Sequence, residues 1–277
     1  MAHPAFRSGR TAVITGAASG IGLAAAKRAA SLEMAVVLVD LPGERLVDAA
    51  NRIKALGARV MSMAIDVSEM DATNQAAAQA AAEMPPITVV MNNAGMGRPS
   101  TAVGEREAWQ HTLAVNFWGV LNGTQAFFPF IEAHGERAVI INTGSKQGIT
   151  TPPGNPAYNV SKAAVKSYTE ALAHELRNRE NCAVSAHLLI PGWVHTAMTA
   201  PSGEKDAATW TPEQTIDFML DSLERDDFYI LCPDNETPRT LDERRIAWAA
   251  ADMIENRPAL SRWHPDWAEA FKIFARQ

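Results

Sequence analysis

The stretch Thr15-Gly16-Ala17-Ala18-Ser19-Gly20-Ile21-Gly22 decides the fold of this 277-residue chain. It follows a short apolar run and opens a helical pattern. Glycines in such a turn let the backbone approach a pyrophosphate, and the following helix N-terminus offers free N–H groups and partial positive charge. A plain strand-to-helix turn is the alternative, which this placement disfavours. The residues predicted to hold the phosphates are Gly16, Ser19, Gly20, Ile21 and Gly22.

The same alternation of apolar runs and helical patterns continues outward from this loop along the chain. Most of the runs are continuously apolar, as in parallel strands covered on both faces. We therefore predict an α/β fold, a single-domain doubly wound (Rossmann) parallel sheet of about seven strands with helices on both faces. The predicted strands are Thr11–Thr15, Ala35–Val39, Arg59–Ile65, Ile87–Met91, Ala138–Thr143, Val184–Ile190 and Phe228–Cys232. Within this single domain of residues 1–277 we expect a substrate loop or lid at 196–222 and a C-terminal extension at 233–277.

Composition limits the classes of protein to consider. Apolar residues make up 47% and charged residues 20%, as in a soluble globular protein. The net charge of −6 argues against nucleic-acid binding, because proteins that neutralise nucleic-acid phosphates usually carry a basic surface. Without a signal-peptide pattern or an apolar stretch near the roughly 18 residues of a membrane span, we expect a cytoplasmic protein with no membrane association. Two cysteines and scattered histidines do not form a zinc pattern, so we predict no metal site.

An acidic residue follows the second predicted strand. Asp40 stands about twenty residues after the glycine loop, where a carboxylate accepts hydrogen bonds from the adenosine ribose and repels a 2′-phosphate. Neither Leu41 nor the loop residues Ala17 and Ala18 supply a compensating cation. The sequence therefore predicts NAD as the cofactor in preference to NADP.

Polar and small residues also follow the third and fourth predicted strands. Asp66, which precedes Val67, either bonds the adenine amine or caps the next helix at Ser68–Glu69. Small residues after the fourth strand suit a ligand that lies over the sheet edge. The additional residues predicted to bind the cofactor here are Asp66, Val67, Asn93, Ala94 and Gly95.

The segment Tyr158-Asn159-Val160-Ser161-Lys162 lies inside a helical pattern. Positions i and i+4 share one helix face, so the phenol and the ammonium are neighbours. A free tyrosine has a pKa of about 10. A nearby cation favours the phenolate and brings proton transfer closer to the working pH. This spacing arises by chance in many helices, so its context decides its meaning.

Three further features supply that context. Ser145 follows the fifth predicted strand, thirteen residues before Tyr158, and its hydroxyl can bond a substrate oxygen. Asn116 is a polar residue in an apolar helix, where a buried amide needs partners and can be purely structural. After the sixth strand, Pro191-Gly192-Trp193-Val194-His195-Thr196 can hold a nicotinamide carboxamide through its backbone and Thr196. These features together predict an oxidoreductase site.

With these motifs in this order, the chain resembles the short-chain dehydrogenases/reductases of the single-domain type. The matching residues are the Thr15–Gly22 loop, Asn92–Gly95, Asn116, Ser145, Tyr158, Lys162 and Pro191–Thr196, over roughly residues 10 to 200. The resemblance implies that Tyr158 is the general acid/base and that Lys162 lowers its pKa and bonds the nicotinamide ribose. It also implies that Ser145 positions the substrate oxygen, that Asn116 holds a water of a proton relay, and that the cofactor is also held by Tyr158, Lys162, Pro191, Gly192, Val194 and Thr196.

The segments after residue 196 predict the substrate side of the site and the assembly. A polar loop from Thr196 to Thr211 is typical of a lid. Gln147, Trp193, Met198 and Trp210 are the candidate substrate contacts, and His195 is a candidate for the entrance. Beyond residue 233 we expect one helix, Thr240–Glu255, and an irregular end. Because this tail carries three of the seven tryptophans and aromatic residues favour interfaces, we expect a homodimer or homotetramer.

The sequence thus predicts an NAD-dependent enzyme that moves a hydride between nicotinamide and a small-molecule secondary alcohol or ketone, of a bulky or aromatic kind. The competing hypothesis is a catalytically silent NAD-binding regulator or scaffold of the same fold. Retention of Ser145, Asn116, Tyr158 and Lys162 together argues against that hypothesis, because a binding module has no need of an acid/base tyrosine.

Overall fold

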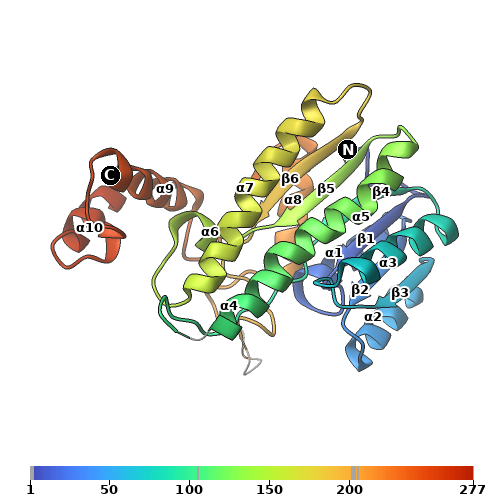
Figure 1. Cartoon of the computed structure of the whole chain (residues 1–277), viewed down its shortest axis with the longest axis horizontal. Helices are drawn as coiled ribbons and strands as arrows, with labels where there is room; N and C mark the ends of the chain where they lie inside the picture. Colours follow the sequence, from blue (N-terminus) through green and yellow to red (C-terminus); the bar gives the residue numbers. More distant parts are fainter. Residues whose placement is uncertain (1–2, 105, 201–203, 205, 277) are drawn as a thin grey trace.

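Parallel strand pairing builds the centre of the molecule. The computed structural model describes residues 3–104, 106–200, 204 and 206–276, and in this part of the chain one seven-stranded parallel sheet has the order β3-β2-β1-β4-β5-β6-β7 (Figure 1). The strands are β1 Thr11–Thr15, β2 Ala35–Asp40, β3 Val60–Ala64, β4 Ile87–Asn92, β5 Ala138–Thr143, β6 Val184–Ile190 and β7 Tyr229–Leu231. The predicted α/β fold with seven parallel strands is therefore confirmed.

Burial explains why apolar runs identified the strands so well. Strands β1, β4 and β5 are buried at every position, so the continuous runs of β-branched residues face packed helices on both sides. The edge strands are shorter than predicted. β3 pairs with β2 alone and keeps exposed positions, and β7 pairs with β6 over three residues. The residues that flank them still form single backbone hydrogen bonds to the neighbouring strand, from the Ile65 N–H to the Asp40 carbonyl and from the Cys232 N–H to the Ile190 carbonyl, so the difference concerns only the strand ends.

Helices cover both faces of the sheet. Helices α1, α2 and α8 bury their apolar sides against one face, and α3, α5 and α7 cover the other, where Figure 1 shows them in front of the strands. Alanines of α1 and α3 allow these helices to approach the sheet closely. The helices of this α/β body are α1 Gly20–Ser31, α2 Glu44–Ala55, α3 Met70–Glu83, α4 Arg106–Leu113, α5 Gly119–Ala133, α6 Gln147–Thr150, α7 Pro156–Asn178 and α8 Pro212–Glu224.

The order of the strands creates the position of the site. β1 pairs with β2 on one side and with β4 on the other, so the chain reverses direction across the sheet at β1. The segments that follow β1 and β4 diverge at the carboxyl ends of these strands. Open α/β sheets bind ligands in the crevice that opens at such a switch point.

The chain beyond β7 forms a helical unit at one side of the α/β body (Figure 1). It consists of α9 Arg239–Ile254, a 3₁₀ turn η2 Ser261–Trp263, and α10 Ala268–Arg276. The predicted helix is confirmed, but the prediction of an irregular end was wrong. Trp248 of α9 is buried against the rings of Phe271 and Phe274, with centroid separations of 5.4 and 5.3 Å, and this aromatic cluster supports α10.

In the described part of the chain, no helix combines the length and the apolar character that crossing a membrane requires.

Candidate active site

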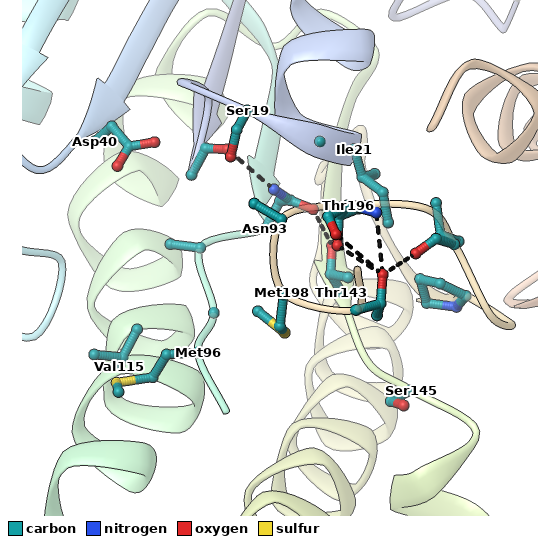
Figure 2. A pocket seen from close by; sticks show the side chains of 18 of the residues that line it. Ser19, Ile21, Asp40, Asn93, Met96, Val115, Thr143, Ser145, Thr196 and Met198 are labelled. Atoms are coloured by element: carbon teal, nitrogen blue, oxygen red, sulfur yellow. Dashed lines mark hydrogen bonds between the residues drawn. The ribbon is translucent and has the colours of Figure 1, made fainter. Parts of the chain in front are cut away.

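A cavity of about 420 Å³ runs along the carboxyl edge of the sheet. Figure 2 shows Asp40, the last residue of β2, and Ser145, after β5, at opposite ends of this cavity. Its lining joins the glycine loop to the segments after five further strands. The lining residues are Gly16, Ser19, Gly20, Ile21, Asp40, Leu41, Ile65, Asp66, Val67, Asn93, Ala94, Gly95, Met96, Val115, Thr143, Gly144, Ser145, Tyr158, Lys162, Pro191, Gly192, Val194, Thr196, Ala197, Met198 and Thr199.

The glycine loop leaves the N-terminus of α1 open toward this cavity. Gly16 and Gly20 have φ of +65° and +53°, which L side chains rarely adopt. A Cβ on Gly22 would lie 2.2 Å from the Gly16 carbonyl oxygen, so this glycine permits tight packing and does not itself line the cavity. The N-cap Ser19 makes no side-chain cap bond, and the first turn of α1 carries no acidic residue. Free N–H groups with this polarity suit a phosphate.

The carboxylate of Asp40 is fixed at the far end of the cavity. Its Oδ2 accepts a hydrogen bond from the Ala18 N–H at 2.8 Å, and its Oδ1 accepts one from the Leu41 N–H at 2.8 Å. Among the described residues that line the cavity, Lys162 carries the only cationic side chain, and it lies with the residues after β5. The Asp40 end of the cavity is therefore acidic.

Asp66 lines the cavity without capping a helix. Its Oδ1 accepts hydrogen bonds from the backbone N–H and the hydroxyl of Ser68, at 2.9 and 2.8 Å. The following helix α3 begins at Met70, with Glu69 as its N-cap. Of the two roles considered for Asp66, helix capping is thus wrong, because the carboxylate instead closes a turn before the helix.

Backbone contacts join the two segments at the switch point. Thr15 Oγ1 accepts hydrogen bonds from the N–H groups of Asn93 and Ala94, at 2.9 and 3.0 Å. Asn93 Nδ2 donates to the Thr15 carbonyl at 3.2 Å, and Asn93 Oδ1 accepts from Thr143 (Figure 2). These bonds hold the segments after β1, β4 and β5 side by side at the middle of the cavity.

Helix α7 brings Tyr158 and Lys162 to the cavity wall opposite Ser145. Asn155 caps this helix and accepts a hydrogen bond from the Tyr158 N–H, which fixes the first turn. Lys162 is buried, and its Nζ donates to the Thr143 carbonyl at 2.8 Å. The same Nζ lies 5.8 Å from the centre of the Tyr158 ring. All three side chains thus line one end of the cavity.

Burial controls the protonation of this group. Burial raises the pKa of Tyr158 above its ordinary value, and the hydrogen bond with Ser145 offsets only part of that rise. Burial also lowers the pKa of Lys162 to about 8. The direction for Tyr158 is opposite to the one expected from the tyrosine–lysine spacing, because the loss of water on burial outweighs the opposing hydrogen bond with Ser145.

Asn116 lies in the wall behind the cavity. The segment Ala114–Trp118 is a turn of π-helix, a feature that often marks functional sites and that the apolar sequence pattern did not reveal. Asn116 is fully buried, its Oδ1 accepts from the Met96 N–H at 2.8 Å, and its Nδ2 donates to the Met96 carbonyl and to Ser161 Oγ. Its amide therefore holds the segment after Gly95 against α7.

The segment after β6 forms the remaining wall. Of its residues predicted to hold the cofactor, Pro191, Gly192, Val194 and Thr196 all line the cavity. His195 is not part of the described lining, and its N–H donates to the Trp210 carbonyl at 2.8 Å. This bond and the Val194–Trp210 bridge close the base of the loop that follows.

The predicted substrate residues separate into two groups. Met198 lines the cavity, whereas Gln147, Trp193 and Trp210 are absent from its described lining. Trp193 is 47% exposed, and Trp210 packs edge-on against Phe218 of α8, with ring centroids 5.7 Å apart. Trp210 therefore contributes to packing, a role that its position in a polar loop concealed.

The predicted lid at 196–222 combines two different structures. Residues 196–199 line the cavity, whereas 212–222 belong to α8, whose buried apolar side packs against α1. A capping box at Thr211 and Gln214 starts this helix, so residues 212–222 form a packed helix and not a polar loop. Residues 201–203 and 205, also within the predicted lid, lie outside the described residues.

Several lining residues had not been expected from the sequence. Thr143 and Gly144 stand where β5 ends, so the rule that selected Asn93 and Ala94 identifies them equally well. Val115 and Met96 carry no comparable signal, because apolar residues of this kind occur throughout the core.

A family model described as short chain dehydrogenase matches residues 10–207 of the chain. That match spans the glycine loop, Ser145, Tyr158 and Lys162, all of which line the cavity.

The chain belongs to the short-chain dehydrogenase/reductase family.

Individual members of this family resemble the chain over most of its length. It is 32% identical to the 1-deoxy-11-beta-hydroxypentalenate dehydrogenase of Streptomyces arenae, over 92% of this chain and 93% of that protein. It is 36% identical to the putative oxidoreductase SadH of Mycobacterium tuberculosis, over 69% and 68% of the two chains. The crystal structure of a short-chain dehydrogenase/reductase from Burkholderia phymatum in complex with NAD has 28% identity and a TM-score of 0.81, covering 90% of this chain and 96% of that one.

Proposed function

We propose that this short-chain dehydrogenase/reductase is an NAD-dependent enzyme that interconverts a secondary alcohol and a ketone. The observation that carries the proposal is that Tyr158, Ser145 and Lys162 line the same cavity as the Gly16–Ile21 loop and Asp40. The proposed acid/base group and the proposed nucleotide-binding loop therefore face the same cavity, as hydride transfer between cofactor and substrate requires.

The residues present fit a nicotinamide dinucleotide. The uncapped N-terminus of α1 would hold the pyrophosphate, and Asp40 would hold the adenosine ribose. Asp66 and Val67 would flank the adenine, and the Pro191–Thr196 segment would hold the carboxamide. A bound nicotinamide dinucleotide supplies the hydride in reduction and accepts it in oxidation.

The protein's own contribution is to orient the substrate oxygen and to move its proton. Because burial raises the pKa of Tyr158, the phenol is protonated at neutral pH and ready to donate to a ketone oxygen. In alcohol oxidation Tyr158 must first lose its own proton, and the phenolate oxygen then receives the hydroxyl proton. The Ser145 hydroxyl, which bonds the phenol, would share the substrate oxygen with it. Lys162, held by the Thr143 carbonyl, would present its remaining N–H groups to the cofactor ribose.

A bulky substrate accords with the apolar side of the cavity. Met96, Val115 and Met198 contribute to its lining. The Streptomyces arenae relative is named for its action on 1-deoxy-11-beta-hydroxypentalenate. We therefore propose a bulky alicyclic or aromatic secondary alcohol as the substrate class.

A panel of alcohols tests this function directly. The absorbance of NADH would be followed with cyclic, aromatic and small polar secondary alcohols, and binding of NADH would be measured separately by fluorescence. We expect turnover, fastest with the bulky alcohols. Binding of NADH without turnover of any substrate would favour a silent cofactor-binding regulator, and faster turnover of small polar alcohols would contradict the substrate class.

Replacement of Asp40 tests the preference for NAD. In Asp40→Ala, the ratio of kcat/KM with NADP to kcat/KM with NAD should rise about 10²-fold, because the ribose loses a charged acceptor and a 2′-phosphate loses a repelling carboxylate. Glu44→Ala is the matched control, since it removes an exposed carboxylate from the nearby start of α2 outside the cavity lining. An unmodified protein that uses both cofactors equally well would refute the preference.

A further inference from the structure

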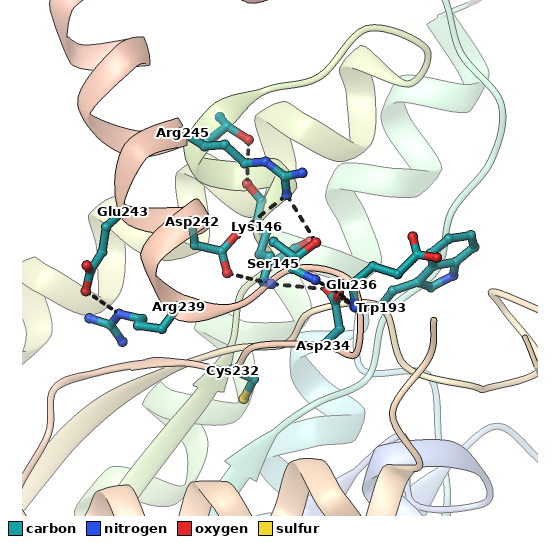
Figure 3. A network of polar contacts seen from close by, with 12 residues as sticks. Ser145, Lys146, Trp193, Cys232, Asp234, Glu236, Arg239, Asp242, Glu243 and Arg245 are labelled. Atoms are coloured by element: carbon teal, nitrogen blue, oxygen red, sulfur yellow. Dashed lines mark hydrogen bonds and ion pairs between the residues drawn. The ribbon is translucent and has the colours of Figure 1, made fainter. Parts of the chain in front are cut away.

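Three segments of the chain meet at the ammonium of Lys146, next to Ser145 (Figure 3). Lys146 Nζ donates a hydrogen bond to Asp234 Oδ2 at 3.2 Å. It also lies 2.6 Å from Asp242 Oδ2, in a close ion pair whose angles do not form an aligned hydrogen bond. Both carboxylate side chains are buried, with exposed fractions of 7% and 5%. The sequence motifs gave no sign of this network.

Asp234 connects Lys146 to the segment after β6. Its Oδ2 also accepts a hydrogen bond from the Trp193 N–H at 3.2 Å, while its Oδ1 accepts from the N–H of Thr237 at 2.7 Å. A Cβ on Gly192 would lie 2.7 Å from Asp234 Oδ2 and 3.1 Å from Lys146 Nζ. Only glycine therefore allows the cavity wall to approach this ion pair so closely.

Asp242 connects Lys146 to α9 of the C-terminal unit. Arg245, one turn later on α9, lies 3.7 Å from Asp242 Oδ1 and donates to the Thr237 hydroxyl at 3.3 Å. Two cations thus balance two buried carboxylates. Burial raises the pKa of Asp242, with Lys146 opposing that rise. Burial also acts to raise the pKa of Asp234, but the ammonium of Lys146 and the hydrogen bonds from Trp193 and Thr237 together outweigh it and lower that pKa.

The loop that carries Ser145 is anchored on two sides. On one side, Gly148 packs so tightly on α7 that a Cβ would lie 2.5 Å from the backbone carbon of Lys162. On the other side, Lys146 is held by Asp242 and Asp234. Ser145 lies next to the second anchor and three residues from the first, at the start of a four-residue helix. Its hydroxyl accepts a hydrogen bond from the Gln147 N–H at 3.2 Å.

Buried ion pairs contribute little net stability, because desolvation opposes their attraction, but they can define a unique arrangement. Here the arrangement includes both the Ser145 loop and the Pro191–Thr196 wall. We propose that Lys146, Asp234 and Asp242 are positioning residues that place the Ser145 hydroxyl and this wall, so that α9 supports a site it does not line. The catalytic part of this inference rests on the proposed function.

The change Asp242→Asn tests the proposal, because it removes one charge while keeping the size of the side chain. We expect kcat to fall about tenfold and the dissociation constant of NADH to change less than about twofold, since small misplacements of reacting groups reduce rates strongly. Glu243→Gln is the matched control. Glu243 is the next residue on α9, and its exposed ion pair with Arg239 lies outside the network (Figure 3). It should leave kcat unchanged.

The double variant Lys146→Met/Asp242→Asn tests whether Asp242 acts through Lys146. If it does, the double variant loses no more kcat than the more damaged single variant, whereas independent roles give multiplied losses. A purely structural role would lower the melting temperature of Asp242→Asn and leave its kcat at 25 °C within twofold of the unmodified enzyme. That result, or multiplied losses, would overturn the proposal.

Amide hydrogen exchange of the ligand-free protein gives a readout independent of activity. In Asp242→Asn, we expect faster exchange in residues 145–150 and 192–196, with no change in β2 and β3 at the far side of the sheet. Faster exchange confined to α9 would contradict the coupling. If the unmodified protein turned over no substrate, the proposed function would fail, and hydrogen exchange would still decide whether α9 positions these two segments.

Discussion

Tyr158→Phe should lower kcat by about 10³-fold while leaving the dissociation constant of NADH within about twofold. The phenol is the acid/base group proposed for the substrate oxygen, and phenylalanine lacks the proton. The ring itself is retained, so the packing of the cavity wall at the start of α7 should survive. Steady-state kinetics with the best alcohol of the panel and fluorescence titration with NADH would measure the two effects.

Tyr168→Phe is a closely matched control for this variant. Tyr168 lies on the same helix, and its ring packs edge-on against Phe117 with centroids 6.4 Å apart, outside the cavity lining. It should keep nearly full activity. If Tyr158→Phe were also nearly as active as the unmodified enzyme, the assignment of the general acid/base would be wrong.

The direction of the Tyr158 pKa shift adds a prediction about pH. A raised pKa keeps the phenol protonated near neutrality, and kcat/KM reports the ionisation of the free enzyme. We therefore expect kcat/KM for alcohol oxidation to increase with pH from 7 and to keep increasing at about 10, the pKa of an ordinary tyrosine. Ketone reduction needs the protonated phenol and should show no such increase.

Lys162→Met should have the second large effect, with opposite consequences for activity and stability. We expect kcat/KM to fall by at least about 10²-fold, because Tyr158 loses its neighbouring cation and the cofactor ribose loses a donor. At pH 7 we expect the free energy of unfolding to rise by about 2 kcal/mol. The lowering of the Lys162 pKa from 10.5 to about 8 corresponds to a burial cost of about 3.4 kcal/mol, and the hydrogen bond of this charged donor to the Thr143 carbonyl returns about 1.5 kcal/mol.

The dependence of this stability on pH follows from the lowered pKa of Lys162. Between pH 8 and 10.5, the ammonium of the unfolded chain stays protonated while that of the folded protein loses its proton. The unfolded state then binds more protons, so the free energy of unfolding of the unmodified protein rises with pH in this window. The advantage of Lys162→Met should therefore be largest below pH 8 and shrink toward pH 10.5.

Thermal and urea unfolding at pH 7 and pH 10 would measure these differences, and about 2 kcal/mol corresponds to a rise in Tm of about 4–8 °C for a protein of this size. Lys166→Met is the matched control. Lys166 lies one turn further along α7 and forms a partly exposed ion pair with Glu170 at 2.7 Å. Such pairs contribute less than about 1 kcal/mol. A Lys162→Met variant less stable than the unmodified protein at pH 7 would contradict the assigned cost of burial.

Local sequence patterns identified residues of the cavity where a polar or small residue stands at the carboxyl end of a predicted strand or soon after it. Asp40 ends a strand, and Asn93, Ser145 and Thr196 follow strands. Parallel strands bring their carboxyl ends to one edge, so residues far apart in sequence meet there. Trp210, predicted as a substrate contact, is absent from the described lining of the cavity. An indole in a polar loop can face a ligand or a neighbouring helix, and its contact with Phe218 depends on where α8 packs.

The C-terminal unit also has contacts that local sequence patterns do not predict. The pattern around Trp248 predicted a helix, but the aromatic cluster that supports α10 requires residues more than twenty positions apart to fold together. The partnership of Lys146 with Asp242 is more distant still. Each of these residues resembles an ordinary surface charge, and only the fold removes both from water.

The sequence by itself determined the individual strands and helices, the glycine loop and the places of Tyr158, Ser145 and Lys162 on them, because each depends on the pattern within a strand, a turn or a single helix face. The tertiary structure alone decided which neighbours surround these groups. It set the direction of the Tyr158 pKa, the bonding of the Asn116 amide and the link from α9 to Ser145. Desolvation and contacts between residues distant in the sequence depend on the whole packed molecule, so a local sequence pattern does not predict them.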